Sequence, residues 1–284
     1  MELHRFARAA ALCCAVASCL PPPLPAQRYG AGDEVAVAAV NAALGGLTTG
    51  VWRVVHGRRF TDGMLTGMAG GALGYAGKRV AVERFFGAGL LGREVGAVGA
   101  SLVRNSADGR PALERVMLPL GPVRFYVTPR EPAPVRVRLD ATATAYAVYQ
   151  AFRANHALDL EQSLSAGAVV FRVYGGGDGV YAGQEDAYTI LLFYPAERRP
   201  LTPEERRAVG ITAGHERVHV LQDDQMFLYV ASPLEDRLLP ARKGLLRHVD
   251  VGLATPLLWR GLSNLIEYED RPWEDEAEIL SLRR

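Results

Sequence analysis

Two histidines four residues apart, with a glutamate directly after the first, are the residues of this chain best suited to chemistry. They lie in the segment GHERVHVLQDDQ, Gly214 to Gln225. On a helix, His215 and His219 share one face and can present ring nitrogens to a single metal ion. Glu216 stands where a carboxylate can act as general base on a metal-bound water without binding the metal. Zinc lowers the pKa of such a water to about 7, so the segment predicts metal-assisted hydrolysis.

The same segment has a second explanation, a surface helix with solvated histidines. Val218, Val220 and Leu221 make the helix partly buried. A buried helix does not bring two histidines together without a partner, because unpaired buried polar groups cost free energy. We therefore favour the metal site.

The residues TAGHERVHVL resemble the zincin metallopeptidases, in which uncharged residues usually flank H-E-x-x-H. Arg217 departs from that preference. The metzincin extension is absent, because its glycine would fall on Gln222 and its last histidine on Gln225. The resemblance therefore implies the gluzincin type, whose third zinc ligand is a glutamate on a later helix.

The segment RPWEDEAEIL offers candidates for that third ligand. Pro272 and the acidic residues after it mark a helix start. Glu274 and Glu278 resemble the gluzincin E-x-x-x-D arrangement, in which the glutamate binds zinc and the acid one turn on bonds a ligand histidine. Glu276 is the competing ligand, but Leu280, four residues after it, offers no such second partner. We expect Glu274 to be the ligand.

Other polar side chains remain as alternatives for the site. His248 is a third candidate ligand, with Asp250 close enough in sequence to orient it. Tyr229 and Tyr268 are alternative donors to an oxyanion, and the sequence does not choose between them.

Composition limits the partners that we expect. The 284-residue chain has 32 basic and 31 acidic side chains, a formal net charge of +1. Such a balance gives no overall field to recruit nucleic acid or an anionic membrane, and we expect no nucleic-acid partner. A peptide or protein substrate fits the motif instead.

Residues 1–26 have the features of a secretory leader. Basic residues precede an apolar run, and a proline-rich stretch ends at Ala26. Within this leader, Val16 to Cys19 resembles a bacterial lipobox, in which the cysteine is lipidated. All three cysteines lie in the leader, so the rest of the chain has no thiol for a disulfide or a metal. We expect an exported protein, either released or anchored through Cys19.

Residues 27–110 form a Gly/Ala-rich section that we predict to be helical, with helices over 35–52 and 62–86. Gly63, Gly67 and Gly71 recur every four residues, which lets two helices approach closely. A membrane hairpin is the alternative. We favour packed core helices, because the segment between the two is strongly polar and the second run soon reaches Lys78.

Residues 111–284 show strands in one block with helices around them, which predicts an α+β domain with a mixed or antiparallel sheet. A hairpin is expected to turn near Gly121. The strands AVVFRVY and AYTILLFY are expected to be joined as a plain hairpin by the loop that begins GGGDG. Thr202 and Glu205 predict a capping box for a helix that ends at Gly210, before a separate helix over 211–225.

Taken with the resemblance, these features lead us to expect an exported zinc metallopeptidase with a zincin-like domain. His215, His219 and Glu274 would hold zinc, and Glu216 would be the catalytic base. The alternative is a non-catalytic, zinc-stabilised binding or structural protein of the cell envelope. Glu216 favours the enzyme, because a purely structural site has no use for a base beside its first ligand.

Overall fold

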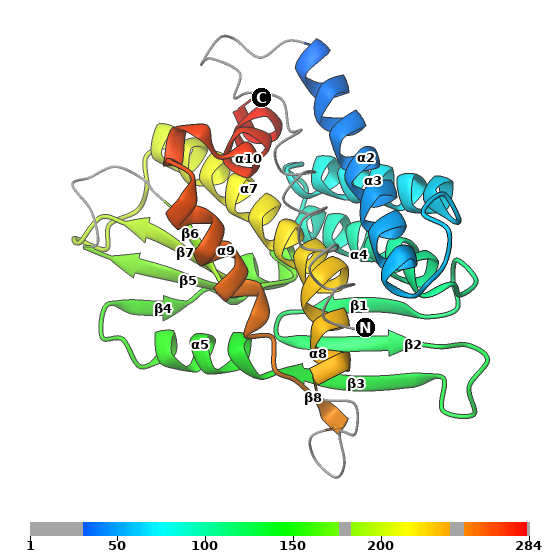
Figure 1. The fold of residues 1–284 in the computed structure, drawn as a ribbon. Helices are drawn as coiled ribbons and strands as arrows, with labels where there is room; N and C mark the ends of the chain where they lie inside the picture. Colours follow the sequence, from blue (N-terminus) through cyan, green and yellow to red (C-terminus); the bar gives the residue numbers. More distant parts are fainter. Residues whose placement is uncertain (1–30, 176–182, 239–246, 283–284) are drawn as a thin grey trace.

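The computed structural model describes residues 31–175, 183–238 and 247–282 (Figure 1). The predicted leader, including Cys19, lies outside these residues, as does most of the glycine-rich loop after Tyr174.

Three helices form the first part of the described chain, as expected for the Gly/Ala-rich section. They are α2 (Ala31–Val55), α3 (Met64–Ala81) and α4 (Ala88–Asp108). Glycines set the closest approach of α3 to α4: a Cβ atom at Gly77 would lie 2.5 Å from the Gly92 carbonyl oxygen, and one at Gly92 would lie 2.4 Å from the Gly77 carbonyl oxygen. The two backbones are therefore in direct contact.

Helix α2 is long and apolar enough, by length and composition alone, to cross a membrane, over Gly32–Val55. It is also tied to distant parts of the chain by two polar side chains. The Asn41 amide donates to the Glu276 carboxylate at 2.6 Å, and the Trp52 indole N–H donates to the Tyr229 carbonyl at 2.7 Å. These contacts favour the packed-helix interpretation of this section over the membrane hairpin.

The first sheet contains the predicted hairpin. Strands β1 (Val116–Leu120) and β2 (Val123–Val127) pair antiparallel around Gly121, whose φ of 54° suits a glycine. Strand β3 (Val135–Asp140) pairs antiparallel with β2, and the short β8 (Val249–Asp250) pairs parallel with β3.

The second sheet has the order β4-β5-β7-β6, and it corrects one prediction. Strands β5 (Val169–Tyr174) and β7 (Thr189–Tyr194) are parallel neighbours, so they do not form a hairpin. The hairpin is made by β6 (Gly183–Asp186) and β7, which a two-residue turn joins. Both turn residues, Ala187 and Tyr188, have positive φ, 47° and 63°. A turn of this kind usually contains Asn or Gly, so its sequence gave no signal.

The histidines lie on one long helix rather than two. Helix α7 runs unbroken over Pro203–Met226, with the predicted capping box between Thr202 and Glu205. Gly210 does not end it, because the chain keeps helical geometry there and the glycine costs only about 1 kcal/mol relative to alanine. A π-helical turn (Phe227–Ala231) and α8 (Ser232–Leu238) continue from its end.

Helix α7 is the central element of the fold (Figure 1). It contacts α3 and α4 on one side and strands β6 and β7 on another, and α10 (Pro272–Leu282) packs along it. The remaining described elements are α5 (Ala141–Ala151), β4 (His156–Leu158), α6 (Leu160–Ala166), α9 (Ala254–Leu265) and a 3-10 turn (Tyr268–Asp270). Two mixed sheets with helices around them make this an α+β protein, as predicted.

The boundary expected near residue 110 coincides with a change of structure, since α4 ends at Asp108 and β1 begins at Val116. The helical section is nevertheless joined to the rest by buried charge. Arg93 of α4 pairs with Asp224 of α7 at 2.6 Å, and both side chains are almost completely buried.

The glycine contact between α3 and α4 gives a stability prediction. Replacing Gly77 by alanine should lower the free energy of unfolding by about 1–3 kcal/mol, because the new Cβ meets backbone that cannot move aside. Gly261, within α9, has open space around it, so Gly261→Ala is the matched control and should add about 0.5–1 kcal/mol. Urea unfolding of both variants measures the difference. Equal effects would contradict the proposed backbone contact.

Candidate metal centre

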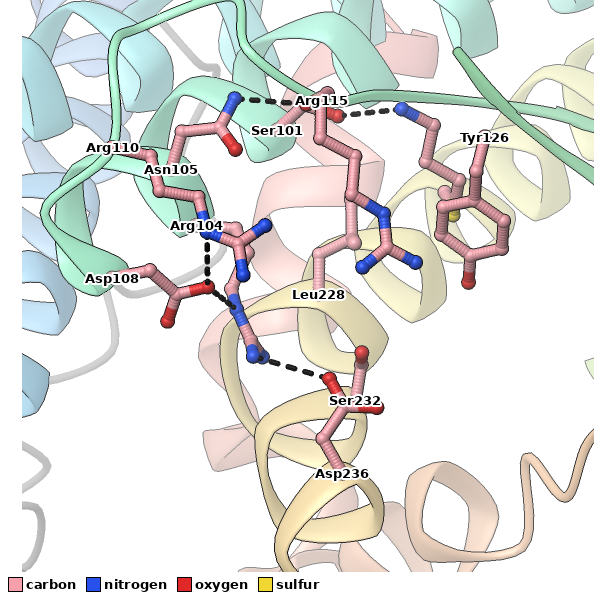
Figure 2. Close-up of a pocket in the computed structure, with 11 residues that line it drawn as sticks. Ser101, Arg104, Asn105, Asp108, Arg110, Arg115, Tyr126, Leu228, Ser232 and Asp236 are labelled. Atoms are coloured by element: carbon pink, nitrogen blue, oxygen red, sulfur yellow. Dashed lines mark hydrogen bonds and ion pairs between the residues drawn. The ribbon is translucent and has the colours of Figure 1, made fainter. Parts of the chain in front are cut away.

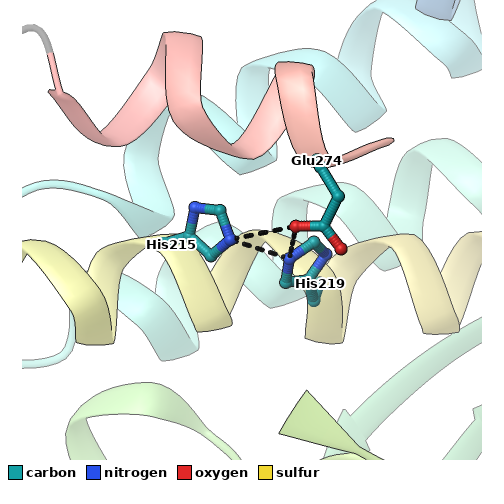
Figure 3. A group of neighbouring side chains, drawn as sticks. All are labelled: His215, His219 and Glu274. Carbon is teal, nitrogen blue, oxygen red and sulfur yellow. Dashed lines mark hydrogen bonds and ion pairs between the residues drawn. The ribbon is translucent and has the colours of Figure 1, made fainter. Parts of the chain in front are cut away.

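Two helices bring three metal-binding side chains together (Figure 3). His215 and His219 project from α7, and Glu274 projects from the first turn of α10. The Glu274 Oε2 atom lies 3.3 Å from His215 Nε2 and 3.2 Å from His219 Nε2, and the two Nε2 atoms are 3.0 Å apart. We call these three residues the His–Glu group.

The spacing of these donor atoms suits a small tetrahedral ion. Zinc binds nitrogen and carboxylate oxygen at about 2.0–2.2 Å, which places neighbouring ligand atoms of a tetrahedron about 3.3 Å apart. The three measured separations, 3.0 to 3.3 Å, lie close to that value. The group is the one set of three or more such ligands that come together within the described residues.

The His–Glu group is partly open to solvent. The exposed fractions of the side chains of His215, His219 and Glu274 are 18%, 14% and 15%. Three protein ligands with solvent access leave a fourth position for water, which is the arrangement of catalytic rather than structural zinc sites.

Glu276 points away from the histidines and is already fully engaged. Its carboxylate pairs with the Lys78 ammonium at 2.7 Å and accepts hydrogen bonds from Asn41 at 2.6 Å and Gln222 at 2.8 Å. Burial alone would raise the pKa of Glu276, but Lys78 and these donors outweigh it and lower the pKa. The structure therefore brings Glu274, rather than Glu276, to the histidines.

His248 is not near the His–Glu group. It is exposed beside β8 of the first sheet, and its Nε2 accepts a hydrogen bond from the Arg247 side chain at 2.8 Å. Its role as a ligand is thus not supported.

Gln222 orients one of the histidines. Its Oε1 lies 2.8 Å from His219 Nδ1, while its Nε2 donates to the Trp273 carbonyl and to Glu276. The Gln222 side chain therefore holds Nδ1 of His219, the ring nitrogen that does not face Glu274. This is the role that was expected of Glu278. A contact of Glu278 with His215 stays a prediction.

The charges of the His–Glu group favour the binding of a cation. Burial raises the pKa of Glu274, but hydrogen bonds and charge from both histidines reverse this and hold it well below its usual range. Burial lowers the pKa of His219, but Glu274 outweighs it and raises the pKa overall. A carboxylate that stays ionised beside two imidazoles attracts either a proton or a metal ion.

Glu216 is the base candidate, and it lies against strand β6. Its side chain is 5% exposed, and burial raises its pKa, against the opposing effect of His219 and His215. A Cβ atom at Gly183 would lie 2.6 Å from Glu216 Oε1, so only glycine leaves room for this carboxylate. Sequence reasoning missed β6, and with it this constraint.

Further acidic groups lie behind Glu216. Burial raises the pKa of Asp223 to about 7, and it raises the pKa of Glu185, on β6, well above the ordinary value. The Asp223 carboxyl is hydrogen-bonded to Glu185, and each is close enough to share one proton with the other. The surroundings of Glu216 are therefore acidic on the side of the sheet and basic on the side of the histidines.

Of the two tyrosines considered, Tyr268 is the one at the site. Its hydroxyl donates to Glu274 Oε2 at 3.3 Å, and partial burial together with Glu274 raises its pKa to about 12. The Tyr229 hydroxyl is buried without a hydrogen-bond partner among the described residues, and burial followed by the charge of Glu276 raises its pKa. Tyr268 is 56% exposed, which leaves its hydroxyl accessible to a substrate.

A separate polar pocket lies between α4, β1, β2 and α8 (Figure 2). Arg104 joins Asp108 at 2.9 Å and Asp236 at 3.3 Å across it. Its volume of about 20 Å³ has room for about one water molecule, so it is not a substrate site.

Comparison with known proteins identifies no relative: no family model, curated protein or solved structure matches the chain. The chemistry of the site is therefore argued from its geometry.

The two competing glutamates make opposite predictions for isosteric variants. Glu274→Gln should lower zinc affinity at least about 100-fold, because it removes a ligand charge. Glu276→Gln should keep zinc affinity within about tenfold but cost about 3 kcal/mol of stability, because Lys78 loses its buried counter-charge. Zinc titration against a chelating dye and thermal unfolding measure the two quantities. The reverse ranking of zinc affinities would move the third ligand to Glu276.

Proposed function

We propose that this chain is a zinc-dependent metallopeptidase with a zincin-like active site. The observation that carries the proposal is the His–Glu group itself. Glu274 lies 55 positions beyond His219 (274 − 219), so proximity along the chain cannot explain their meeting. The three donor atoms lie at the mutual distances that a tetrahedral ion requires.

The donor set favours zinc among the common metal ions. Two imidazoles and one carboxylate, with one position left for water, form a typical catalytic zinc site, whereas magnesium and calcium prefer oxygen ligands alone. When bound, zinc would lower the pKa of a water molecule and polarise the carbonyl group under attack.

Glu216 is the group that would move the proton. It follows His215 directly in sequence and interacts electrostatically with all three residues of the His–Glu group. In peptide hydrolysis, its carboxylate would accept a proton from the attacking water and donate it to the departing amine nitrogen. The raised pKa of Glu216 suits this exchange, because proton transfer is most efficient when the pKa is close to the working pH.

Strand β6 supports a peptide as substrate. It is the last strand of its sheet, and Glu216 packs against it. No other strand of the described residues pairs with its outer edge, so an extended peptide can add there through backbone hydrogen bonds. Tyr268 would then donate to the carbonyl oxygen as negative charge develops on it.

The rival proposal is a zinc-stabilised envelope protein without turnover, and export is proposed for both. Export rests on the leader sequence of residues 1–26 and attachment on Cys19. The Glu216→Gln variant separates the two functions.

Glu216→Gln should retain zinc and lose at least about 100-fold in kcat, because the variant keeps the ligands and removes the base. Glu204→Gln, on the exposed first turn of the same helix, is the matched control and should behave as the unmodified chain. The measurements are zinc content and hydrolysis of a broad peptide library. If both the unmodified chain and Glu216→Gln hold zinc and neither cleaves any peptide, the non-catalytic alternative is correct.

Tyr268→Phe should lower kcat by about 100-fold, with KM and zinc content nearly unchanged, because the hydroxyl acts mainly on charge that develops in the transition state. Tyr229→Phe is the comparison, and its kcat should not fall, since the Tyr229 hydroxyl makes no hydrogen bond in the part of the chain that the structure describes. Steady-state kinetics on one cleaved peptide would measure both. An unchanged kcat for Tyr268→Phe would remove this tyrosine from the mechanism.

A further inference from the structure

A groove of about 950 Å³ lies behind α7, away from the His–Glu group. It is bordered by the α3–α4 connection, α6, strands β5 and β7, and the first half of α7. Arg217 lines it and points about 160° around the helix from both histidines. The volume is that of a site for a sizeable ligand.

The groove is strongly cationic. Seven of its lining residues are arginines and two are glutamates. Among the ion pairs of the described residues, Arg172 pairs with Asp159 and Arg199 with Glu205, both at 2.6 Å, and Arg84 also has a partner. The excess positive charge is local, because the whole chain is close to neutral at +1.

Arg217 is the residue of the groove best placed to bind an anion. Its side chain is buried, with 9% exposed, and no carboxylate of the described residues forms an ion pair with it. Within the described residues, its guanidinium donates only to the Ala81 carbonyl at 3.4 Å and the Gln162 side chain at 3.2 Å, and its Nε has no acceptor. A buried charge without a counter-charge is costly, so an anion that enters the groove would relieve it.

Exposed aromatic side chains adjoin this charge. Phe85 and Phe86, in the turn between α3 and α4, are 51% and 67% exposed and lie on the wall of the groove. Two exposed phenylalanines next to arginines suit a ligand with an apolar part and an anionic head, and this combination is typical of proteins that dock on an anionic membrane surface.

We propose that this groove binds the phosphate headgroup of an anionic phospholipid at a bilayer surface. Arg217 would pair with the phosphate, and Phe85 and Phe86 would enter the boundary between headgroups and acyl chains. The site is separate from the His–Glu group and needs no metal.

The test is co-sedimentation of the full chain with vesicles. Cys19→Ala in every protein prevents lipidation. Vesicles of equal parts phosphatidylglycerol and phosphatidylcholine are compared with vesicles of phosphatidylcholine alone, and the ratio of the two affinities is recorded. The leader is present in all variants, so its contribution does not change between them. Arg217→Gln and the double variant Phe85→Ser with Phe86→Ser should each lower the affinity for phosphatidylglycerol vesicles about fivefold or more.

Arg136→Gln, an exposed arginine of β3 outside the groove, is the matched control and should not change the affinity ratio. Thermal unfolding shows whether each variant folds. If Arg217→Gln does not fold, Arg207→Gln, at an exposed position of the groove, takes its place and should lower the ratio as well.

Three results would overturn the proposal. The first is an affinity ratio for Arg217→Gln equal to that for Arg136→Gln. The second is stabilisation of the protein by inorganic phosphate or glycerol phosphate that depends on Arg217, while the protein shows no preference for phosphatidylglycerol vesicles. That result would indicate a soluble phosphate ligand. In the third, polyglutamate binds to the protein in a way that depends on Arg217 and displaces it equally from vesicles of both compositions. That result would indicate that the groove binds an acidic polypeptide.

Discussion

The buried ion pair between Lys78 and Glu276 is the contact on which the geometry of the metal centre depends. Lys78 lies on α3 and Glu276 on α10, and Gln222 of α7 and Asn41 of α2 complete the hydrogen bonds of the carboxylate. A charge buried this deeply is tolerated only with such partners, so the position of α10 is narrowly fixed. Glu274 is two residues earlier on the same helix and therefore faces the opposite way, toward the histidines. The helical section is thus part of the support for the candidate site.

Helix α7 carries several kinds of contact on different faces. The face that carries His215 and His219 also packs Val218 against Ala277 and Leu280 of α10, and the opposite face places Arg217 behind the site. Near its end, Asp224 receives the buried Arg93 of α4. A helix fixed on all sides holds catalytic side chains with little freedom, and such rigidity favours precise chemistry.

Local patterns in the sequence were sufficient for much of the site. The spacing of His215 and His219 fixes their shared helix face, and Glu274, which was preferred to Glu276, lies beside both histidines. The i, i+4 argument for that preference relied on Glu278 as the partner of a histidine, which stays a prediction, and the contact that engages Glu276, Lys78, could not be foreseen. The capping box and the hairpin at Gly121 were also predictable, because turn and cap chemistry is local.

The errors concern features that depend on tertiary contacts. The parallel pairing of β5 with β7 involves residues far apart in the chain, and β6 is short and bordered by a turn without Asn or Gly. Gly210 was expected to end a helix, but Val209 and Ala213 on either side of it are buried in the core, which outweighs its small intrinsic cost. Nor could the sequence choose Tyr268 over Tyr229, because the choice depends on how the chain returns to α10.

The π-helical turn at Phe227–Ala231 gives the chain one residue more than a regular helix would need there. Because it holds one extra residue, the residues after it are rotated by about 100° from the positions that a regular helix through the same residues would give them. Here that rotation directs Glu235 of α8 toward the chain after β8, where its carboxylate accepts hydrogen bonds from the backbone N–H groups of Val251 at 3.3 Å and Gly252 at 2.8 Å. A regular α-helix through the same residues would place Glu235 about 100° away from them. The path of the chain into α9, and from there to α10, therefore depends on an irregularity of one residue.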